Sequence, residues 1–418
     1  MKNPFKLVID IEMIRKFVTN DNGTVSGHFQ SHRLRSAFQP IFSLAHKRTV
    51  GYEALIRVQD EGGTPVPPTD LFSNKKEESE IVLLDRLCRF IHLGNFKLVR
   101  DDLNWLFLNI SPMVMRNGPR YGPFFNELLS SYAFPPHRIV VEIVEHPIAD
   151  QTLLFDTVNY YKSMGCLIAI DDFGAGHSNF ERIWSLGPQI VKLDRSMIVR
   201  AVQQTNIRQL FPSIVSLLHQ AGALVLVEGI EDEEQALIAM DSDVDFVQGY
   251  HFSKPTTDLI DGLNFFFDFD SLSHEFKKRS VIQEKHYKNA YDRYKSSSMR
   301  AVAALQMGKP LEEACVPLFE EDSIERCYLL QTDGIQIGNT IASKKGMANK
   351  DLRYKPLEDA RSADWFRRHY LIRAVMHPNQ VQITRPYLSI TGGHMCVTLS
   401  IMFSAPNGNS VLCCDLRL

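Results

Sequence analysis

Two adjacent aspartates directly follow a short apolar run in the stretch LIAIDDFGAGHSN, at 167–179. The run from Leu167 to Ile170 is typical of a buried strand, and Asp171 and Asp172 follow it without a basic neighbour. Carboxylates placed side by side repel each other unless a cation compensates them or one stays protonated. The stretch therefore predicts either a bound cation or a protonated carboxyl group.

Other apolar runs also carry polar or charged residues near their ends: Glu53, Asn109, Glu142, Glu145, Lys192, Glu228, Glu231 and Gln248. Carboxylate and amide oxygens, without Cys or His at these positions, suit Mg²⁺ or Mn²⁺ and argue against zinc. One of two adjacent aspartates can bridge two ions while the other holds the second ion. We therefore predict a metal site, with the loop at 174–176 bending over it.

Each of these residues, taken alone, also has a structural explanation. An acidic residue after a strand is often the N-cap of the next helix, and a lone lysine is often solvated. Their recurrence on strand after strand favours a functional cluster. His146 and His177 adjoin the acidic positions in loops, and we expect structural roles for them in preference to metal binding.

The elements that must position this cluster are eight strand-like runs: SAFQPIF, VGYEALIRV, WLFLNI, RIVVEIVE, LIAIDDF, IVKLD, LVLVEGI and DFVQGYHF. From the third run onwards the separations admit a helix, which predicts a parallel α/β barrel of the TIM (β/α)8 kind. Only SLAHKRT joins the first two runs, too short for a parallel crossover. We expect a modified barrel over 33–262 with an antiparallel first strand, after a lead-in at 1–32 containing one helix.

The remainder of the chain has a different pattern. One long helix is predicted from about 271 to 308, within a helical connector over 263–310. The turns TDG, TGG and PNGN between β-rich segments predict an antiparallel α+β domain over 311–418, with a helix at SADWFRRHYLIRAV.

Composition excludes several classes of protein. The chain has 418 residues and a net charge of −3, with 44% hydrophobic and 23% charged residues. These values are typical of a soluble globular protein and predict no nucleic-acid or membrane-surface partner. No apolar run approaches the roughly 18 residues of a membrane span, and the N-terminal stretch lacks a signal-peptide pattern. The seven cysteines are an odd number without paired spacing, which gives no sign of a disulfide framework. We therefore expect a cytoplasmic protein.

The chain resembles the EAL family of cyclic di-GMP phosphodiesterases over roughly residues 33–256. The resemblance rests on eight motifs in order: FQPI at 38–41, EALIR at 53–57, NISP at 109–112, EIVE at 142–145, DDFGAG at 171–176, KLD at 192–194, EGIE at 228–231 and QGY at 248–250. It implies hydrolysis of cyclic di-GMP to linear pGpG with two Mg²⁺ or Mn²⁺ ions. The alternative is a catalytically silent cyclic di-GMP receptor that signals to a protein partner.

The resemblance also implies roles for individual residues. Glu53, Asn109, Glu142 and Asp171 would be ligands of one metal ion, and Asp171 and Asp172 would serve the second. Lys192 would contact the phosphate and the attacking water, and Glu228 would act as general base or metal partner. Substrate-binding residues would be Gln39, Leu55, Arg57, with Arg57 on phosphate, and Gln248, which also helps hold the water and metal site. Glu145 and Glu231 would anchor the loop at 172–180.

Departures from the family pattern fall on Ala175, His177 and Gln189, none of them an implied metal ligand. The C-terminal domain resembles a PAS-like or Cache-like sensory fold. Trp365, Arg373, Tyr387 and Asp415 either line a small-ligand pocket there or serve as packing residues. The resemblance further implies a homodimer whose activity the C-terminal domain regulates.

Overall fold

The structure, a computed structural model, describes residues 8–21, 23–72, 77–99, 102–111, 114, 124–144, 151–176, 180–257, 266–348, 360–389, 394–406 and 408–417. Its contacts divide the chain into two units, Met1–Lys277 and Lys278–Leu418. Each unit is described by itself below.

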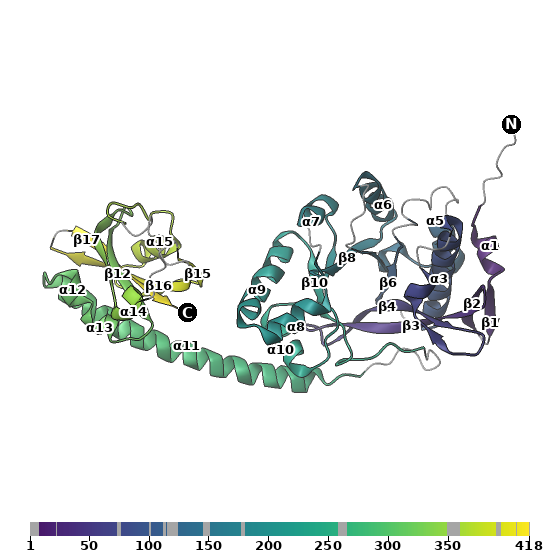
Figure 1. Ribbon diagram of the computed structural model, residues 1–418, viewed down its shortest axis with the longest axis horizontal. Coiled ribbons are helices and arrows are strands. Elements are labelled where there is room, and N and C mark those ends of the chain that lie inside the picture. Colours follow the sequence, from purple (N-terminus) through teal and green to yellow (C-terminus); the bar gives the residue numbers. More distant parts are fainter. Residues whose placement is uncertain are drawn as a thin grey trace. The chain divides into compact units, whose positions relative to one another are not determined.

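The first unit is built around a closed barrel of eight strands: β3 (His32–Ser43), β4 (Arg48–Gln59), β6 (Trp105–Asn109), β7 (Ile139–Val144), β8 (Leu167–Phe173), β9 (Ile190–Leu193), β10 (Leu224–Val227) and β11 (Phe246–Val247). Their order is β3-β11-β10-β9-β8-β7-β6-β4, and pairing of β3 with β4 closes the ring. Figure 1 shows this ring with helices around its outside. The predicted barrel is confirmed.

The first barrel strand runs against its neighbours, also as predicted. Strand β3 pairs antiparallel with both β4 and β11, whereas β4 and β6 to β11 pair in parallel. The short connection after β3 permits only a hairpin. Parallel strands such as β9 (IVKL) and β10 (LVLV) are nearly all apolar because both of their faces are covered.

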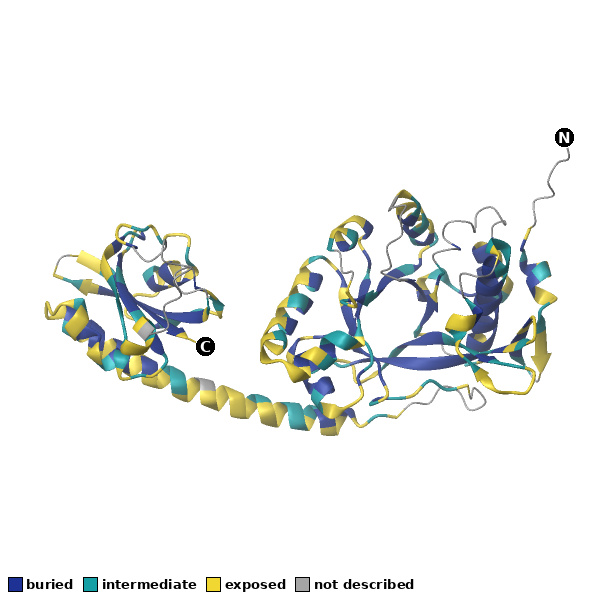
Figure 2. Ribbon diagram, viewed as in Figure 1, coloured by how far each residue is buried: buried dark blue, intermediate teal, exposed yellow. Residues whose placement is uncertain are grey.

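The floor of the barrel is a closed apolar layer. Ile41, Phe107, Val140, Ala169, Ile190, Leu226 and Phe246 form one buried cluster inside the ring. Gly51 completes the layer on β4, because a Cβ there would lie 2.7 Å from the Phe107 ring. Figure 2 shows the strands of the ring as buried and the outer helix faces as largely exposed.

Helices cover the outside of the barrel. The described helices of this unit are α1 (Ile11–Arg15), α2 (Pro68–Leu71), α3 (Glu78–Leu98), α5 (Phe124–Tyr132), α6 (Gln151–Ser163), α7 (Phe180–Leu186), α8 (Arg195–Gln203), α9 (Thr205–Gln220) and α10 (Glu233–Asp241), with a 3₁₀ turn at Pro136–Arg138. No helix among the described residues is both long enough and apolar enough to cross a membrane.

The lead-in contains more structure than the sequence predicts. The expected helix is α1, but two strands follow it, β1 (Val18–Asp21) and β2 (Thr24–Phe29). They extend the sheet beyond β3, and a short strand β5 (Pro65–Val66) pairs with β4. The strands were missed because Asn20, Asp21 and Gly27, which have low strand propensity, interrupt two short runs that are not continuously apolar.

The second unit contains an antiparallel sheet, as predicted. Its strands are β12 (Ile324–Gln331), β13 (Gln336–Ala342), β14 (Gln382–Ile383), β15 (Tyr387–Leu388), β16 (Met395–Ala405) and β17 (Gly408–Arg417), in the order β13-β12-β17-β16-β14, with β15 also on β16. Helices α12 (Leu311–Ala314), α13 (Val316–Phe319), α14 (Lys344–Ala348) and α15 (His369–Met376) accompany it. Helix α11 (Phe269–Gln306) is the predicted long helix, and the division into units falls within it.

The helix predicted at SADWFRRHYLIRAV is shorter than expected, because α15 begins only at His369. The residues before it pack on the β12–β13 turn instead: Trp365 N–H donates to the Gly334 carbonyl at 2.9 Å, and Asp364 bridges to Ile335. Gly334 has φ +102°, and a Cβ there would lie 2.6 Å from Phe366 N. This tertiary contact overrides the local helical pattern. All seven cysteines are buried and free.

A buried ion pair ties α3 to the end of β6. Asp85 and Arg89, both almost fully buried, pair within α3, and Asp85 Oδ1 accepts from the Ser111 N–H at 3.0 Å. Removing one partner of such a pair leaves an uncompensated buried charge. The pair therefore holds the segment directly after Asn109.

We predict that Asp85→Ala lowers the free energy of unfolding by about 3–5 kcal/mol, measured by chemical denaturation. The matched control is Glu12→Ala, which removes an exposed pair with Arg15 and costs less than about 1 kcal/mol. Similar losses for the two variants would contradict the role assigned to the buried pair.

Candidate functional site

Eight polar residues stand directly above the apolar floor, one from each barrel strand. On seven strands the polar residue comes two positions after the floor residue: Glu53, Asn109, Glu142, Asp171, Lys192, Glu228 and Gln248. On β3, which runs in reverse, Gln39 comes two positions before Ile41. Because side chains two apart on a strand share a face, the barrel turns the predicted residues into one cluster.

Lys192 is the centre of this cluster. Its side chain is 1% exposed, and its Nζ pairs with Glu142 Oε1, with Glu228 Oε1 at 2.5 Å, with Asp171 Oδ1 at 2.9 Å and with Glu53 Oε2 at 3.8 Å. The sequence alternative of a solvated lysine is therefore wrong. The ammonium group partly compensates four carboxylates.

Amide side chains orient the carboxylate of Glu53. Asn109 Nδ2 donates to Glu53 Oε1 at 3.2 Å, and Gln248 Nε2 donates to Glu53 Oε2 at 2.8 Å. Gln248 Nε2 also donates to Gln39 Oε1 at 3.2 Å, and Gln39 Nε2 donates to the Ser253 carbonyl at 3.2 Å. This chain of hydrogen bonds fixes one wall of the site.

The shared burial of these groups shifts their pKa values. Burial raises the pKa of Glu142 well above its ordinary value, against the attraction of Lys192. Burial alone would lower the pKa of Lys192, but Asp171, Glu142, Glu228 and Glu53 together raise it well above its ordinary value. Burial raises the pKa of Glu228 to about 8, with further increases from Asp171 and Glu53 and an opposing effect of Lys192. The site thus favours additional positive charge.

The two adjacent aspartates both face the site because the backbone is irregular there. The pairing of β8 with β9 shifts register between Ile170 and Phe173, and Asp172 has φ +57°. Such bulges re-aim side chains, and Asp is among the residues that tolerate this conformation. The Asp172 N–H donates to Asp171 Oδ1 at 3.1 Å.

These donors fit a hard divalent cation. Asp171, Asp172 and Glu228 each offer a carboxylate oxygen, and the three oxygens lie within 4.8 Å of one another. Both oxygens of Glu142 are buried and, apart from the ion pair with Lys192, have no hydrogen-bond partner among the described residues. The ligand atoms are all oxygens, and Lys192 compensates their negative charge only in part. Such a set suits Mg²⁺ or Mn²⁺.

The cluster opens into a cavity of about 940 Å³, part of it open to solvent, lined by Gln39, Glu53, Asp171, Asp172, Lys192, Arg195, Glu228, Gly229, Glu231, Gln248, Gly249 and Tyr250. Four lining residues were not singled out as site residues from the sequence: Arg195, Gly229, Gly249 and Tyr250. Gly229 lies within the EGIE motif, Gly249 and Tyr250 lie within QGY, and Arg195 directly follows KLD, so a position in or next to a motif was an available signal.

The remaining predicted residues differ in their placement. Glu231 lines the cavity and pairs with Arg195 at 2.6 Å. Leu55 and Arg57 are on β4 but do not line the cavity. Glu145, His146 and His177 lie outside the described residues. Their predicted roles stay predictions.

Fold and site together define a class of protein: a modified α/β barrel that carries a lysine-centred cluster of oxygen ligands. The family model of the EAL domain matches residues 23–255, more than half of the chain. The chain belongs to the EAL-domain family.

Several known proteins are similar to this chain. YkuI of Bacillus subtilis, an uncharacterized EAL-domain containing protein, is 26% identical over 382 residues, which span 87% of this chain and 90% of YkuI. The signaling protein YkoW of the same organism is 27% identical over 52% of this chain and 28% of YkoW. The cyclic di-GMP phosphodiesterase PdeF of Escherichia coli is 25% identical over 54% of this chain and 30% of PdeF. The chain thus spans less than a third of YkoW and PdeF.

A solved structure also shares the fold. The crystal structure of YkuI in complex with substrate cyclic di-GMP and calcium gives a TM-score of 0.74 at 24% identity. The match covers 92% of this chain and 96% of that one. At this identity the likeness concerns the fold.

We predict that Mn²⁺ or Mg²⁺ raises the melting temperature of the protein, because an ion that binds only the folded state stabilises it. At 100 times its Kd, an ion adds about 2.7 kcal/mol. Asp171→Asn removes one ligand charge and is expected to abolish most of the shift, measured by thermal denaturation with and without metal. The control Asp156→Asn, an exposed position on α6, keeps the full shift. An unchanged shift in Asp171→Asn would place the ion elsewhere.

Proposed function

We propose that this chain is a cyclic di-GMP phosphodiesterase that hydrolyses its substrate to linear pGpG. One observation carries the proposal: Lys192 and its four carboxylates stand together at the open end of an EAL barrel. Two relatives add support from their names, PdeF as a cyclic di-GMP phosphodiesterase and YkuI as a protein solved with cyclic di-GMP.

The cofactor in this proposal is a pair of Mg²⁺ or Mn²⁺ ions, held by Glu53, Asn109, Glu142, Asp171 and Asp172. Bound ions of this kind supply positive charge to the phosphate and lower the pKa of a coordinated water. Their ligands are already held in place by hydrogen bonds from Asn109 and Gln248 to Glu53. Little reorganisation is then needed at the moment of reaction.

The reaction adds the oxygen of a water to one phosphorus and breaks the bond from that phosphorus to a ribose oxygen. The ribose oxygen takes up a proton and leaves as a hydroxyl group, so that the cyclic molecule becomes a linear one. Lys192 contributes a permanent positive charge next to the phosphate and the nucleophile. Glu228 Oε1, 2.5 Å from Lys192 Nζ, accepts the proton of the attacking water. Arg57 and Leu55 bind the substrate from β4, and Gln39 and Gln248 border the site.

The competing hypothesis is a catalytically silent receptor for cyclic di-GMP. Silent members of the family are expected to lack metal ligands, whereas this chain retains Glu53, Asn109, Glu142, Asp171 and Asp172, together with Lys192 and Glu228. Retention of the complete set favours the enzyme. Binding of cyclic di-GMP without any product would favour the receptor.

We further propose that the chain forms a homodimer and that a sensory C-terminal unit controls turnover. Their support is the resemblance and the presence of a separate sheet domain after α11. A long helix can transmit a signal only if the parts at its two ends each adopt two arrangements, so that a change at one end shifts the equilibrium at the other. The C-terminal unit is therefore proposed as the regulator, and the EAL barrel as the catalytic part.

The deciding experiment incubates the purified chain with cyclic di-GMP and Mg²⁺ or Mn²⁺ and separates the products by chromatography. We expect linear pGpG, with no product in excess chelator and loss of activity in Asp171→Asn and Glu53→Ala. Calcium should inhibit, because it prefers a larger and looser coordination shell. Full hydrolysis in chelator would refute the metal requirement.

We predict that Lys192→Ala reduces kcat by at least about 10²–10³, the effect of removing one charge-stabilising group from a transition state. Binding of cyclic di-GMP in Ca²⁺, measured by calorimetry, should remain detectable, because several other groups share it. The control Lys16→Ala removes an exposed lysine at the end of α1 and should leave kcat within about twofold. Near-normal turnover by Lys192→Ala would disprove its role.

A further inference from the structure

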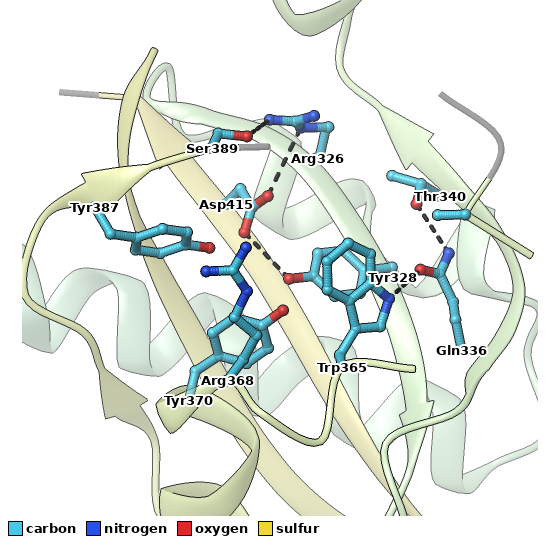
Figure 3. A pocket seen from close by; sticks show the side chains of 11 residues that line it. Arg326, Tyr328, Gln336, Thr340, Trp365, Arg368, Tyr370, Tyr387, Ser389 and Asp415 are labelled. Carbon is cyan, nitrogen blue, oxygen red and sulfur yellow. Dashed lines mark hydrogen bonds and ion pairs between the residues drawn. The ribbon is translucent and has the colours of Figure 1, made fainter. Parts of the chain in front are cut away.

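The pocket of the C-terminal unit is filled by its own side chains. It has about 30 Å³ of room, enough for roughly one or two water molecules, and Figure 3 shows the rings and polar groups that line it. Of the four candidate pocket residues, Trp365, Tyr387 and Asp415 line it and Arg373 does not. Trp365 Nε1 donates to the neighbouring Gln336 Oε1 at 3.0 Å. The three lining residues therefore serve packing and leave no room for a metabolite.

The hairpin of β3 and β4 is longer than the barrel that it closes. Strand β4 pairs with β6 only at 51–53, and β3 pairs with β11 only at 42–43. In contrast, β3 and β4 pair with each other over 33–43 and 48–59, and Figure 1 shows them as two long strands. The hairpin therefore continues beyond the layer of site residues and forms a wall above the site.

One face of this wall is covered, and the other is the face of the site. Ser36 Oγ of β3 lies 2.9 Å from His92 Nδ1 of α3, and Val58 of β4 belongs to the buried apolar core. Because side chains alternate along a strand, the odd-numbered residues of both strands lie on the opposite face. That face carries the site residues Gln39 and Glu53.

Two arginines lie directly opposite each other on the site face. Arg35 of β3 and Arg57 of β4 are cross-strand partners and are half-buried. They lie four positions along the strands from Gln39 and Glu53, which corresponds to roughly 13 Å. Neither arginine pairs with a carboxylate among the residues that the structure describes. Like charges opposite each other destabilise a sheet, and an anion held between the two guanidinium groups would remove this repulsion.

The cations of the cavity wall are already engaged. Among the described residues that line the cavity these are Lys192 and Arg195. Lys192 pairs with four carboxylates, and Arg195 pairs with Glu231 at 2.6 Å. A cyclic dinucleotide carries two phosphates, of which only one can lie at the carboxylate cluster and react. The carboxylates repel the other phosphate, so its binding requires cations above the cluster.

We propose that Arg35 is a substrate-binding residue, which together with Arg57 holds the phosphate of cyclic di-GMP that is not being hydrolysed. A planar guanidinium fork forms two parallel hydrogen bonds with a phosphate, and two forks facing each other across the hairpin can hold one phosphate from both sides. Ala37 and Leu55 lie opposite each other between the arginines and the site residues, and they offer an apolar surface to the ribose that joins the two phosphates. This inference rests on the proposed function for the identity of the ligand, but it does not depend on hydrolysis.

The test measures binding of cyclic di-GMP to the full chain by calorimetry in Ca²⁺. Arg35→Gln should weaken binding at least about tenfold, the effect of one lost charge-assisted hydrogen bond. The matched control is Arg48→Gln, which changes an exposed arginine of the same hairpin on the far side of the floor, and it should bind as the parent does. Equal affinities of the two variants would overturn the proposal.

A double variant tests whether the two arginines share one phosphate. If they hold the same group, the losses in Arg35→Gln and Arg57→Gln overlap, and the double variant loses clearly less affinity than the product of the two single losses. Independent losses that multiply would refute the shared contact. In turnover, Arg35→Gln should raise KM and leave kcat within about threefold, because a contact to the unreacting phosphate is the same before and during the reaction. A fall in kcat at unchanged KM would instead place Arg35 at the reacting phosphate and contradict the proposal.

Melting temperatures separate this role from a structural one. Without ligand, Arg35→Gln should melt at or above the temperature of the parent, because the substitution removes the repulsion from Arg57. A lower melting temperature would make Arg35 a structural residue and count against the proposal. If the parent binds cyclic di-GMP without hydrolysing it, the proposed phosphodiesterase activity fails, while the affinities of the variants still decide the role of Arg35. If the parent does not bind cyclic di-GMP at all, both proposals fail.

Discussion

The barrel is organised around one buried ammonium group. Four carboxylates would repel one another in this water-poor space, and Lys192 Nζ is the cation that reaches all of them. Burial of these charges is unfavourable for each residue alone. The surrounding amide side chains and the packed floor must therefore hold the charged groups in position. A hard divalent cation would relieve the repulsion that remains between the carboxylates.

Side chains alternate along a strand, so the need to place one charged or polar group per strand above the floor appears as a simple pattern in the sequence. Each strand contributes an apolar residue to the floor and, two positions away, a polar residue to the site. A shift of register by one residue would turn both residues outward. Packing of the floor and geometry of the site are therefore set by the same strand pairing, and a change that loosens Phe107 also moves Asn109.

The sequence predicted the parts of the structure in which local pattern and tertiary role agree. Strand ends such as Asp171 and Glu228 were identified because an acidic residue directly follows a buried apolar run. Strands β1 and β2 were missed because they are held by pairing, β2 with β3 and β1 with β2, and the local sequence does not reveal this pairing. The extent of α15 was overestimated because Trp365 contacts the turn at Gly334, a residue far from it in the sequence, and local patterns do not reveal such a contact. The place of Arg195 in the cavity wall likewise depends on folding, since its ion pair joins residues 36 positions apart.

The apolar floor closes the barrel below the site. Residues Ile41, Phe107, Val140 and Leu226 are fully buried, so nothing passes along the barrel axis, and Gly51 lets the Phe107 ring seal the remaining gap. Whatever occupies the cavity therefore arrives and leaves on the side of the polar cluster, above the floor. A molecule that has not yet left that side delays the arrival of the next one, so its residence time limits the rate of exchange.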